Sequence, residues 1–189
     1  MDMFEYVAVL TSIIIGLGIA HLLRGLTQLI QHPEQAGVSF VHLCWVAYTF
    51  LLTVFWWWWE FRLGTMEVWT FGVYLFVILY AVLIFVLCSL LFPASISGFD
   101  GLKGYFFAKR AWFFGIFIFL QFIDTGDTLL KGMEYFHSLG IEYSISKVAQ
   151  ILLSAVAIVT RNEKFHGFFA IAALAYMASQ AFRYYGTVG

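Results

Sequence analysis

Few charged side chains interrupt the apolar segments of this chain, and several in its C-terminal half are spaced for contact. Gln121 and Asp124 are three residues apart and share one face of a helix, with Asp127 about 60° away. Lys147 and Gln150 share a face of the next apolar segment, and Lys147 lies at roughly the depth of Asp124. This pattern predicts an ion pair between Asp124 and Lys147, supported by the two glutamines.

Two kinds of chemistry fit a charged pair at that depth. Ionisable groups within a membrane are costly, and they usually face a protein interior or a water-filled cavity. One interpretation is a structural ion pair that fixes the register of two helices. The other is a site near the outer membrane surface that binds a proton or a small cation, since buried ionisable groups are suited to relay protons.

The first apolar segment has small and polar residues on two helical faces. Ser12, Gly16 and Ala20 form a ridge of small residues that lets another helix approach closely. We therefore expect this segment at the centre of the bundle or at a seam between protomers, either packed or lining a pathway. The first stripe consists of Glu5, Ser12, Gly16, Ala20, Arg24 and Thr27. The second stripe, on roughly the opposite side, consists of Thr11, Gly18, His21 and Gln28.

Three histidines lie in or at the edges of apolar segments, where imidazoles from neighbouring helices can ligate haem or a metal. His21 lies about nine residues from one helix end and His42 about four, a depth difference of about 7 Å that argues against bis-histidine haem. A zinc site of His42, Cys44 and His166 is also disfavoured, because residues i and i+2 project to different sides of a helix. We expect no cofactor, no metal site, hydrogen-bonded histidines, and free thiols at Cys44 and Cys88.

A run of four tryptophans ends the second apolar segment. Four consecutive indoles point in every direction around a helix, so no single packing face accounts for them. Amphipathic rings gather at the level of the lipid headgroups, and the run therefore predicts an interfacial anchor. The alternative is a stacking platform for a ligand or a quinone ring. The four residues are Trp56, Trp57, Trp58 and Trp59.

The elements that position these residues follow from the composition. The 189-residue chain is 62% hydrophobic and only 11% charged, so it lacks the polar surface that a soluble domain of this size needs. A membrane span takes about 20 mostly apolar residues, and continuous apolar runs of that length favour helices over barrel strands. The sequence predicts an all-α, polytopic transmembrane helical bundle in a single domain, residues 1–189. Its six spans cover residues 4–30, 38–59, 68–92, 111–130, 143–160 and 165–185.

The basic residues indicate how the bundle sits in the membrane. Six spans place both termini on one side, and the loops of the opposite side, with their flanks, hold six Lys and Arg residues against four. The positive-inside rule then places both termini outside the cytoplasm. The N-terminus has no Lys or Arg before its apolar run and no small-residue cleavage site, which indicates a retained first span and not a signal peptide.

The chain carries no motif that names a reaction. It has no Walker loop, dinucleotide fingerprint, nucleophile elbow, zinc-protease signature or CxxC pair. Its ten basic residues are scattered over both sides of the membrane, which argues against a nucleic-acid partner. The expected partner of its apolar surface is the lipid bilayer.

Two stretches of the chain resemble a known group of proteins. Residues 4–23 read FEYVAVLTSIIIGLGIAHLL, and the Trp-rich end of the second span is followed by Glu60. In these features the chain is similar to a group of small, uncharacterised bacterial membrane proteins, mainly over residues 4–60. The resemblance implies a bacterial inner-membrane protein of six helices, and it implies no activity.

Three functions fit these observations, and only the third includes a membrane enzyme. The preferred function is a homo-oligomeric channel or small transporter for protons or small cations. The second is a non-catalytic scaffold or accessory subunit, in which a protein partner carries the chemistry. The third is a redox or cofactor-binding membrane protein that uses its histidines. The residues expected to line a pore or to form its polar network are Glu5, His21, Arg24, Gln121, Asp124, Asp127, Lys147 and Gln150.

Overall fold

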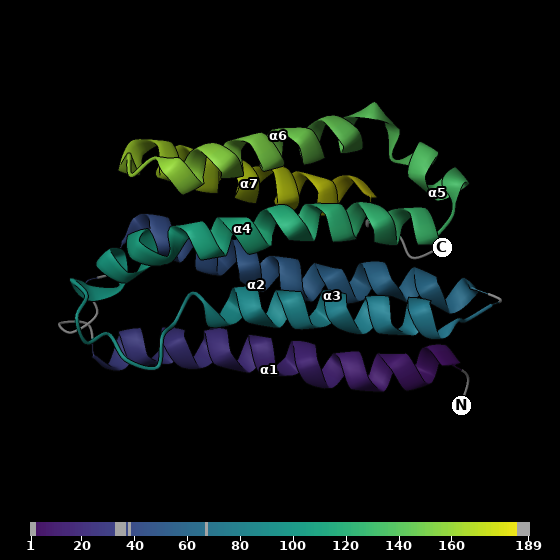
Figure 1. Ribbon diagram of the computed structural model, residues 1–189, viewed down its shortest axis with the longest axis horizontal. Helices are drawn as coiled ribbons and strands as arrows, with labels where there is room; N and C mark the ends of the chain where they lie inside the picture. Colours follow the sequence, from purple (N-terminus) through teal and green to yellow (C-terminus); the bar gives the residue numbers. More distant parts are fainter. Residues whose placement is uncertain (1–2, 33–36, 38, 67, 185–189) are drawn as a thin grey trace.

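The computed structural model describes residues 3–32, 37, 39–66 and 68–184, and every regular element within these ranges is a helix. Six of the helices are long and apolar enough to cross a membrane, which makes the chain a multi-pass membrane protein (Figure 1). The helices are α1 (Met3–Gln31), α2 (Phe40–Glu60), η2 (Phe61–Thr65), α3 (Phe71–Ser89), α4 (Gly101–Leu130), α5 (Met133–Ser138), α6 (Gly140–Val159) and α7 (Glu163–Tyr184).

The predicted all-α fold with six spans is confirmed, and the differences lie at the helix ends. α4 begins at Gly101, whereas the predicted span begins at position 111, and its 30 residues extend over about 45 Å. α6 has only 20 residues and extends over about 30 Å, close to the thickness of a hydrocarbon core. The sequence does not predict α5, because six residues are too few to show a helical period. The predicted span limits at positions 38 and 185 lie outside the described residues.

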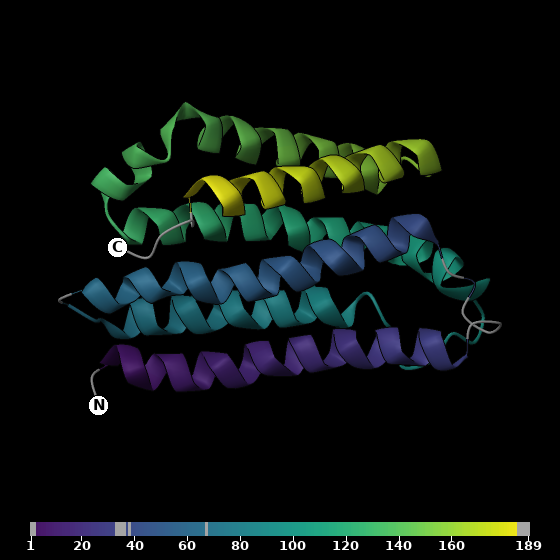
Figure 2. The ribbon, with the colours of Figure 1, turned by 180° about the vertical axis from the view of Figure 1, so that it is seen from behind.

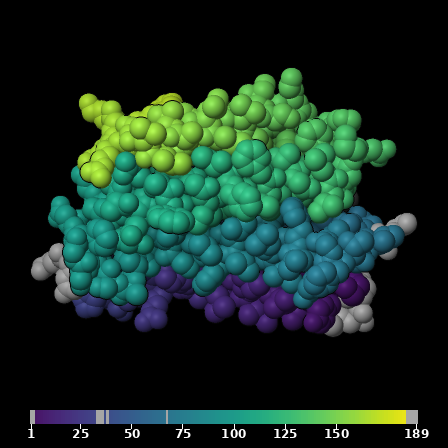
Figure 3. All heavy atoms as spheres, in the orientation of Figure 1, coloured from purple at the N-terminus to yellow at the C-terminus, as the bar shows by residue number. Residues whose placement is uncertain are grey.

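The spans form an elongated bundle in which α1 starts and α7 ends toward the same end (Figure 1). α1 packs mainly against α3, α4 against α6 and α3, and α2 against α7. α1 therefore lies along one edge of the bundle, as the space-filling view also shows (Figure 3). The α6–α7 pair lies at the other edge, and α7 is on the side seen in Figure 2. We call the end that carries η2 and α5 the terminal end.

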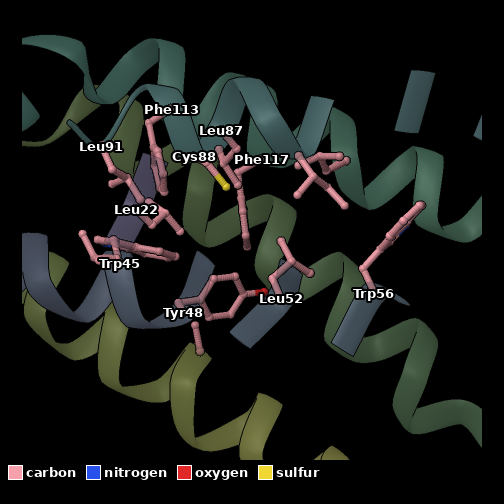
Figure 4. Close-up of a cluster of buried hydrophobic side chains, with 14 of the residues drawn as sticks. Leu22, Trp45, Tyr48, Leu52, Trp56, Leu87, Cys88, Leu91, Phe113 and Phe117 are labelled. Carbon is pink, nitrogen blue, oxygen red and sulfur yellow. The ribbon is translucent and has the colours of Figure 1, made fainter. Parts of the chain in front are cut away.

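The core of the bundle is built around α2. Trp45 on this helix has no exposed surface and is drawn with Phe113 in Figure 4. Its ring meets those of Phe113, Phe114 and Phe169 edge-on, with centroids 5.1–5.4 Å apart. Edge-to-face aromatic pairs add to the free energy gained by burying the rings. These rings fill the half of the bundle that lies away from the terminal end.

α1 is at the edge of the bundle, so the prediction of a central position for the first span is wrong, and its position at a seam between protomers stays a prediction. α2 takes the centre because its large aromatic side chains bury more apolar surface. In the 18-residue stretch that is most apolar, 56% of the residues of α2 are buried, against 28% in α1. The side of α1 that meets α3 carries Gly18, where a Cβ atom would lie 3.3 Å from Cys88 Sγ. The predicted ridge of Ser12, Gly16 and Ala20 is exposed on the outer side of the protomer.

Candidate functional site

Charged side chains gather at the terminal end of the bundle, between α2, α4 and α6. Asp124 lies six residues before the end of α4, and Lys147 lies seven residues after the start of α6. At 1.5 Å per residue, both are about 10 Å inside their helix ends. They belong to a group that we call the charge network, which consists of Glu60, Asp124, Asp127, Lys131 and Lys147.

Two glycines fold α6 back along α4 and bring the network together. Gly132 has a φ of 115° and Gly140 a φ of 67°, values that residues with a side chain rarely adopt. The two glycines bracket α5, so the chain reverses its direction over the short stretch from Leu130 to Gly140. As a result, Lys147 faces α4 at the depth of Asp124.

The predicted ion pair is confirmed, because Lys147 Nζ lies 2.6 Å from Asp124 Oδ2. Lys147 also donates a hydrogen bond to Gln121 Oε1 at 3.1 Å, as the helical spacing predicts. The hydroxyl of Tyr80 donates to Asp124 Oδ1, and that of Tyr143 donates to Oδ2, each at 2.8 Å. Sequence reasoning missed both tyrosines, since neither spacing nor composition distinguishes them from other tyrosines in the spans.

A more deeply buried cluster surrounds Lys131. Its Nζ lies 2.9 Å from Glu60 Oε1 and also contacts Asp127 Oδ2, and none of the three side chains is more than 4% exposed. Burial by itself would lower the pKa of Lys131, but the carboxylates of Glu60 and Asp127 raise it above its usual value. The ammonium group therefore stays charged between two carboxyl groups.

Glu60 and Lys131 are functional-site candidates that sequence reasoning missed. Both stand at the ends of predicted spans, where charged side chains usually reach water. The four-residue spacing of Asp127 and Lys131 is the one signal that points to this cluster, because residues i and i+4 are neighbours on a helix. Nothing in the sequence relates Glu60 to either of them.

The charge network holds one more carboxyl group than it holds ammonium groups. Lys147 balances Asp124, whereas Lys131 is the one cationic side chain of the described residues that pairs with both Glu60 and Asp127. Glu60 Oε2 and Asp127 Oδ1 are buried and have no hydrogen-bond partner within the described part of the chain. A buried charge without full pairing costs several kcal/mol. With every member ionised, the network therefore has an excess negative charge that attracts a proton or a cation.

Two small cavities flank the Asp124–Lys147 pair. The first has a volume of about 40 Å³ and is lined by residues of α2, α3, α4, α6 and α7, with Gln150 on its wall. The second has a volume of about 50 Å³ and extends to Lys131 and α5. A cavity holds a water molecule when it offers at least about 10–15 Å³ and several polar partners, so both have room for water. The residues that line both cavities are Trp59, Asp124, Lys147 and Gln180.

Aromatic rings close the bundle beyond the first cavity. Tyr48 on its wall donates a hydrogen bond to Gln150 at 3.4 Å, and its ring packs edge-on against Phe117 with centroids 5.4 Å apart (Figure 4). Trp45 lies three residues earlier on α2 and is fully buried. The two cavities thus occupy the terminal half, and aromatic side chains fill the other half.

Three of the predicted pore residues, all on α1, do not join the charge network. Glu5 and Arg24 are exposed on the outer side of the protomer. His21 is half-buried, and its Nε2 lies 3.0 Å from the carbonyl oxygen of Phe92, which follows the end of α3. The structure therefore brings Gln121, Asp124, Asp127, Lys147 and Gln150 together and leaves Glu5, His21 and Arg24 apart from them.

The four tryptophans have different environments. Trp56 has no exposed surface and packs edge-on against Tyr80 with ring centroids 5.5 Å apart, so it is not an interfacial anchor. Trp57 and Trp58 are 39% and 47% exposed, and an anchoring role for these two stays a prediction. Trp59 is half-buried on the walls of both cavities. The helical rotation of 100° per residue explains why one run serves both the core and the surface.

The interior histidines bind backbone carbonyl groups through Nε2, whereas the buried Nδ1 atoms of His42 and His166 have no hydrogen-bond partner among the described residues. His42 Nε2 lies 2.7 Å from the carbonyl oxygen of Leu91, and His166 Nε2 lies 3.0 Å from that of Thr160. Like His21, they bind the chain just after a helix, where carbonyl groups lack helical partners. Both cysteines are buried free thiols. Among the described residues, no group of three or more His, Cys, Asp and Glu side chains is arranged to hold a metal ion.

No protein-family model, curated protein or solved structure matches this chain. The similarity to uncharacterised bacterial membrane proteins therefore stays an expectation. Support for a function comes from the geometry of the charge network and its two cavities.

Proposed function

We propose that the protein is a small transporter for protons or small cations in the bacterial inner membrane. The observation that supports this function is the buried charge network with a cavity on either side of Asp124 and Lys147. Buried ionisable residues beside polar cavities in a membrane protein are typical of ion pathways and proton relays. A purely structural arrangement of ion pairs does not need one more carboxyl group than it has ammonium groups.

The closed half of the bundle favours a transporter over an open pore within one protomer. The rings around Trp45 separate the cavities from the end opposite the terminal end. An ion that enters beside Lys131 can therefore leave on the other side only after a conformational change that moves these rings. By the positive-inside rule, the terminal end faces the non-cytoplasmic side, so the ion enters from outside.

Flux through sealed vesicles tests this function. Purified protein is reconstituted alone, and proton, sodium and potassium movement is measured with an imposed membrane potential. We expect flux above that of empty vesicles and its loss in Asp127→Asn, which removes one carboxyl group of the charge network. Glu142→Gln is the matched control, because Glu142 pairs with Arg183 at the same end but both side chains are 44% exposed. Wild-type protein that moves no proton or cation above empty vesicles would refute the proposal.

The outer face of α1 supports a second candidate, a non-catalytic accessory subunit or scaffold. Ser12, Gly16 and Ala20 are exposed there, and a Cβ atom at Gly16 would meet no described atom within 4 Å apart from the adjacent parts of its own helix. Small residues at this spacing allow close packing of a second helix, either from another copy of the chain or from a protein partner. Gly16→Leu should leave the protomer folded and abolish such an assembly in crosslinked native membranes. A stoichiometric partner that co-purifies would favour this candidate, and a self-sufficient homo-oligomer would favour the transporter.

A further inference from the structure

The carboxyl groups of the charge network differ in the number of donors that they face. Asp124 accepts hydrogen bonds from the ammonium of Lys147 and from the hydroxyls of Tyr80 and Tyr143. Three donors, one of them charged, stabilise a carboxylate in its ionised form. Asp124 is therefore paired, hydrogen-bonded and balanced in charge without any further proton.

Glu60 and Asp127 share a single charged donor. Glu60 Oε1 and Asp127 Oδ2 both contact Lys131 Nζ, while the second oxygen of each carboxyl group has no hydrogen-bond partner among the described residues. Their side chains are only 3% and 4% exposed, so bulk water does not stabilise a second charge. Two ionised carboxylates and one ammonium leave this buried cluster with one negative charge in excess.

One proton removes this excess. The cluster then contains one carboxylic acid, one carboxylate and one ammonium, and its net charge is zero. The hydroxyl of the acid can donate to the neighbouring carboxylate, because Glu60 Oε1 and Asp127 Oδ2 contact the same Lys131 Nζ and the two carboxyl groups are therefore next to each other. Hydrogen bonds from O–H to a carboxylate are short and strong, and two adjacent carboxyl groups commonly hold one proton between them.

Building on the proposed transport function, we propose that Glu60 and Asp127 share one proton and that this pair, not Asp124, is the proton carrier. A hydronium ion in the second cavity, which Asp127 and Lys131 line, gives its proton to the pair and leaves as water. Release is the reverse transfer to a water molecule. The Asp124–Lys147 pair then holds α4 and α6 in register beside the carrier.

The arrangement suits a proton better than a metal cation. Lys131 already occupies the position between the two carboxyl groups, where a metal ion would be held. Hard cations such as Ca²⁺ and Mg²⁺ take about six or more oxygen ligands, whereas Glu60 and Asp127 have only one free oxygen each. In the part of the chain that the structure describes, the titratable groups around the pair supply no further free carboxylate. They are Tyr80 on α3, Asp124 on α4, Tyr135 on α5, and Tyr143 and Lys147 on α6.

Infrared spectroscopy of the purified protein tests the shared proton directly. A protonated carboxylic acid has a C=O stretching band that a carboxylate lacks. At neutral pH we expect this band in the wild type and its loss in both Glu60→Gln and Asp127→Asn. Asp124→Asn and the exposed control Glu142→Gln should retain it. A band that persists in both Glu60→Gln and Asp127→Asn, or that disappears in Asp124→Asn alone, would overturn the proposal.

Thermal unfolding shows whether a variant loses the infrared band because it is misfolded. Glutamine resembles a protonated glutamic acid in shape and charge, so Glu60→Gln should unfold at nearly the wild-type temperature. Asp124→Asn should unfold at a clearly lower temperature, because it leaves Lys147 without its counter-ion. The reverse order of the two variants would contradict the proposal. Loss of the wild-type band on addition of sodium or potassium would also contradict it, because a metal cation would then compete for the site.

The shared proton and the transport function fail in different ways. If vesicles show no flux but Glu60→Gln removes the infrared band, the proton pair stands and the transport function is wrong. If wild-type vesicles carry protons but the band does not depend on Glu60 or Asp127, transport stands and this pair is not the carrier.

Discussion

Replacing Asp124 with asparagine keeps the size of the side chain and removes the charge that faces Lys147. Removing one partner of a buried ion pair costs about 3–5 kcal/mol, because the other charge stays buried and unpaired. Lys147 and Asp124 are 19% and 16% exposed, and Lys147 can extend into a neighbouring cavity, so the lower end of this range applies. We therefore expect a loss of about 3 kcal/mol.

For a chain of this size, 1 kcal/mol corresponds to a shift of about 2–4 °C in Tm, so Asp124→Asn should unfold roughly 6–12 °C below the wild type. The double variant Asp124→Asn with Lys147→Met should recover much of this loss, since replacing both partners of a buried pair is often neutral. The assay is thermal unfolding of the wild type, the single variant and the double variant in one detergent. A wild-type Tm for Asp124→Asn would show that the pair contributes no stability, and additive losses in the double variant would show that the two residues are not coupled.

Three further predictions concern the core, the alkaline limit of stability and the topology. Trp45→Ala should cost about 3–5 kcal/mol, measured by thermal unfolding, whereas Trp45→Phe should cost much less because the indole N–H has no hydrogen-bond partner among the described residues. The pKa of Lys131 is raised in the folded state, so the charged ammonium stabilises the folded protein at neutral pH. This contribution to the free energy of unfolding is lost as pH rises above about 10.4, the pKa of an unfolded lysine. The Tm of Lys131→Met should therefore fall less at alkaline pH than that of the wild type. In a cysteine-free background, an impermeant thiol reagent applied to intact cells should label Ser138→Cys at the terminal end and spare Ser97→Cys at the opposite end, and the reverse pattern would invert the topology.

The parts of the fold that depend on a repeated local signal could be predicted from the sequence. A run of about 20 consecutive apolar residues predicts each span, and the structure has six helices of that kind. The Asp124–Lys147 pair was also accessible, because helical spacing and depth can both be counted from the sequence. Gln121 follows from the same three-residue spacing.

The parts that depend on which helices are neighbours could not be predicted. The contact of Glu60 with Lys131 joins residues 71 positions apart, and no pattern along the chain relates them. The sequence also could not predict that the ridge of α1 faces outward, because small residues such as Gly16 fit a neighbouring helix of the same protomer or of a second protomer equally well. Trp56 and Trp57 show the limit at a single turn, because only tertiary packing decides that the first is buried and the second exposed.

The unequal lengths of α4 and α6 link the ion pair to the elastic properties of the bilayer. α6 is about as long as a hydrocarbon core is thick, and only 17% of its most apolar window is buried, whereas α4 is about half as long again. A bilayer that is thinner or thicker than α6 makes this helix tilt or shift, at a cost of fractions of a kcal/mol per ångström of mismatch. Because Lys147 is on α6 and Asp124 on α4, a shift of α6 relative to α4 changes the distance between the two side chains. The thickness of the surrounding membrane thus affects how closely Asp124 and Lys147 approach each other.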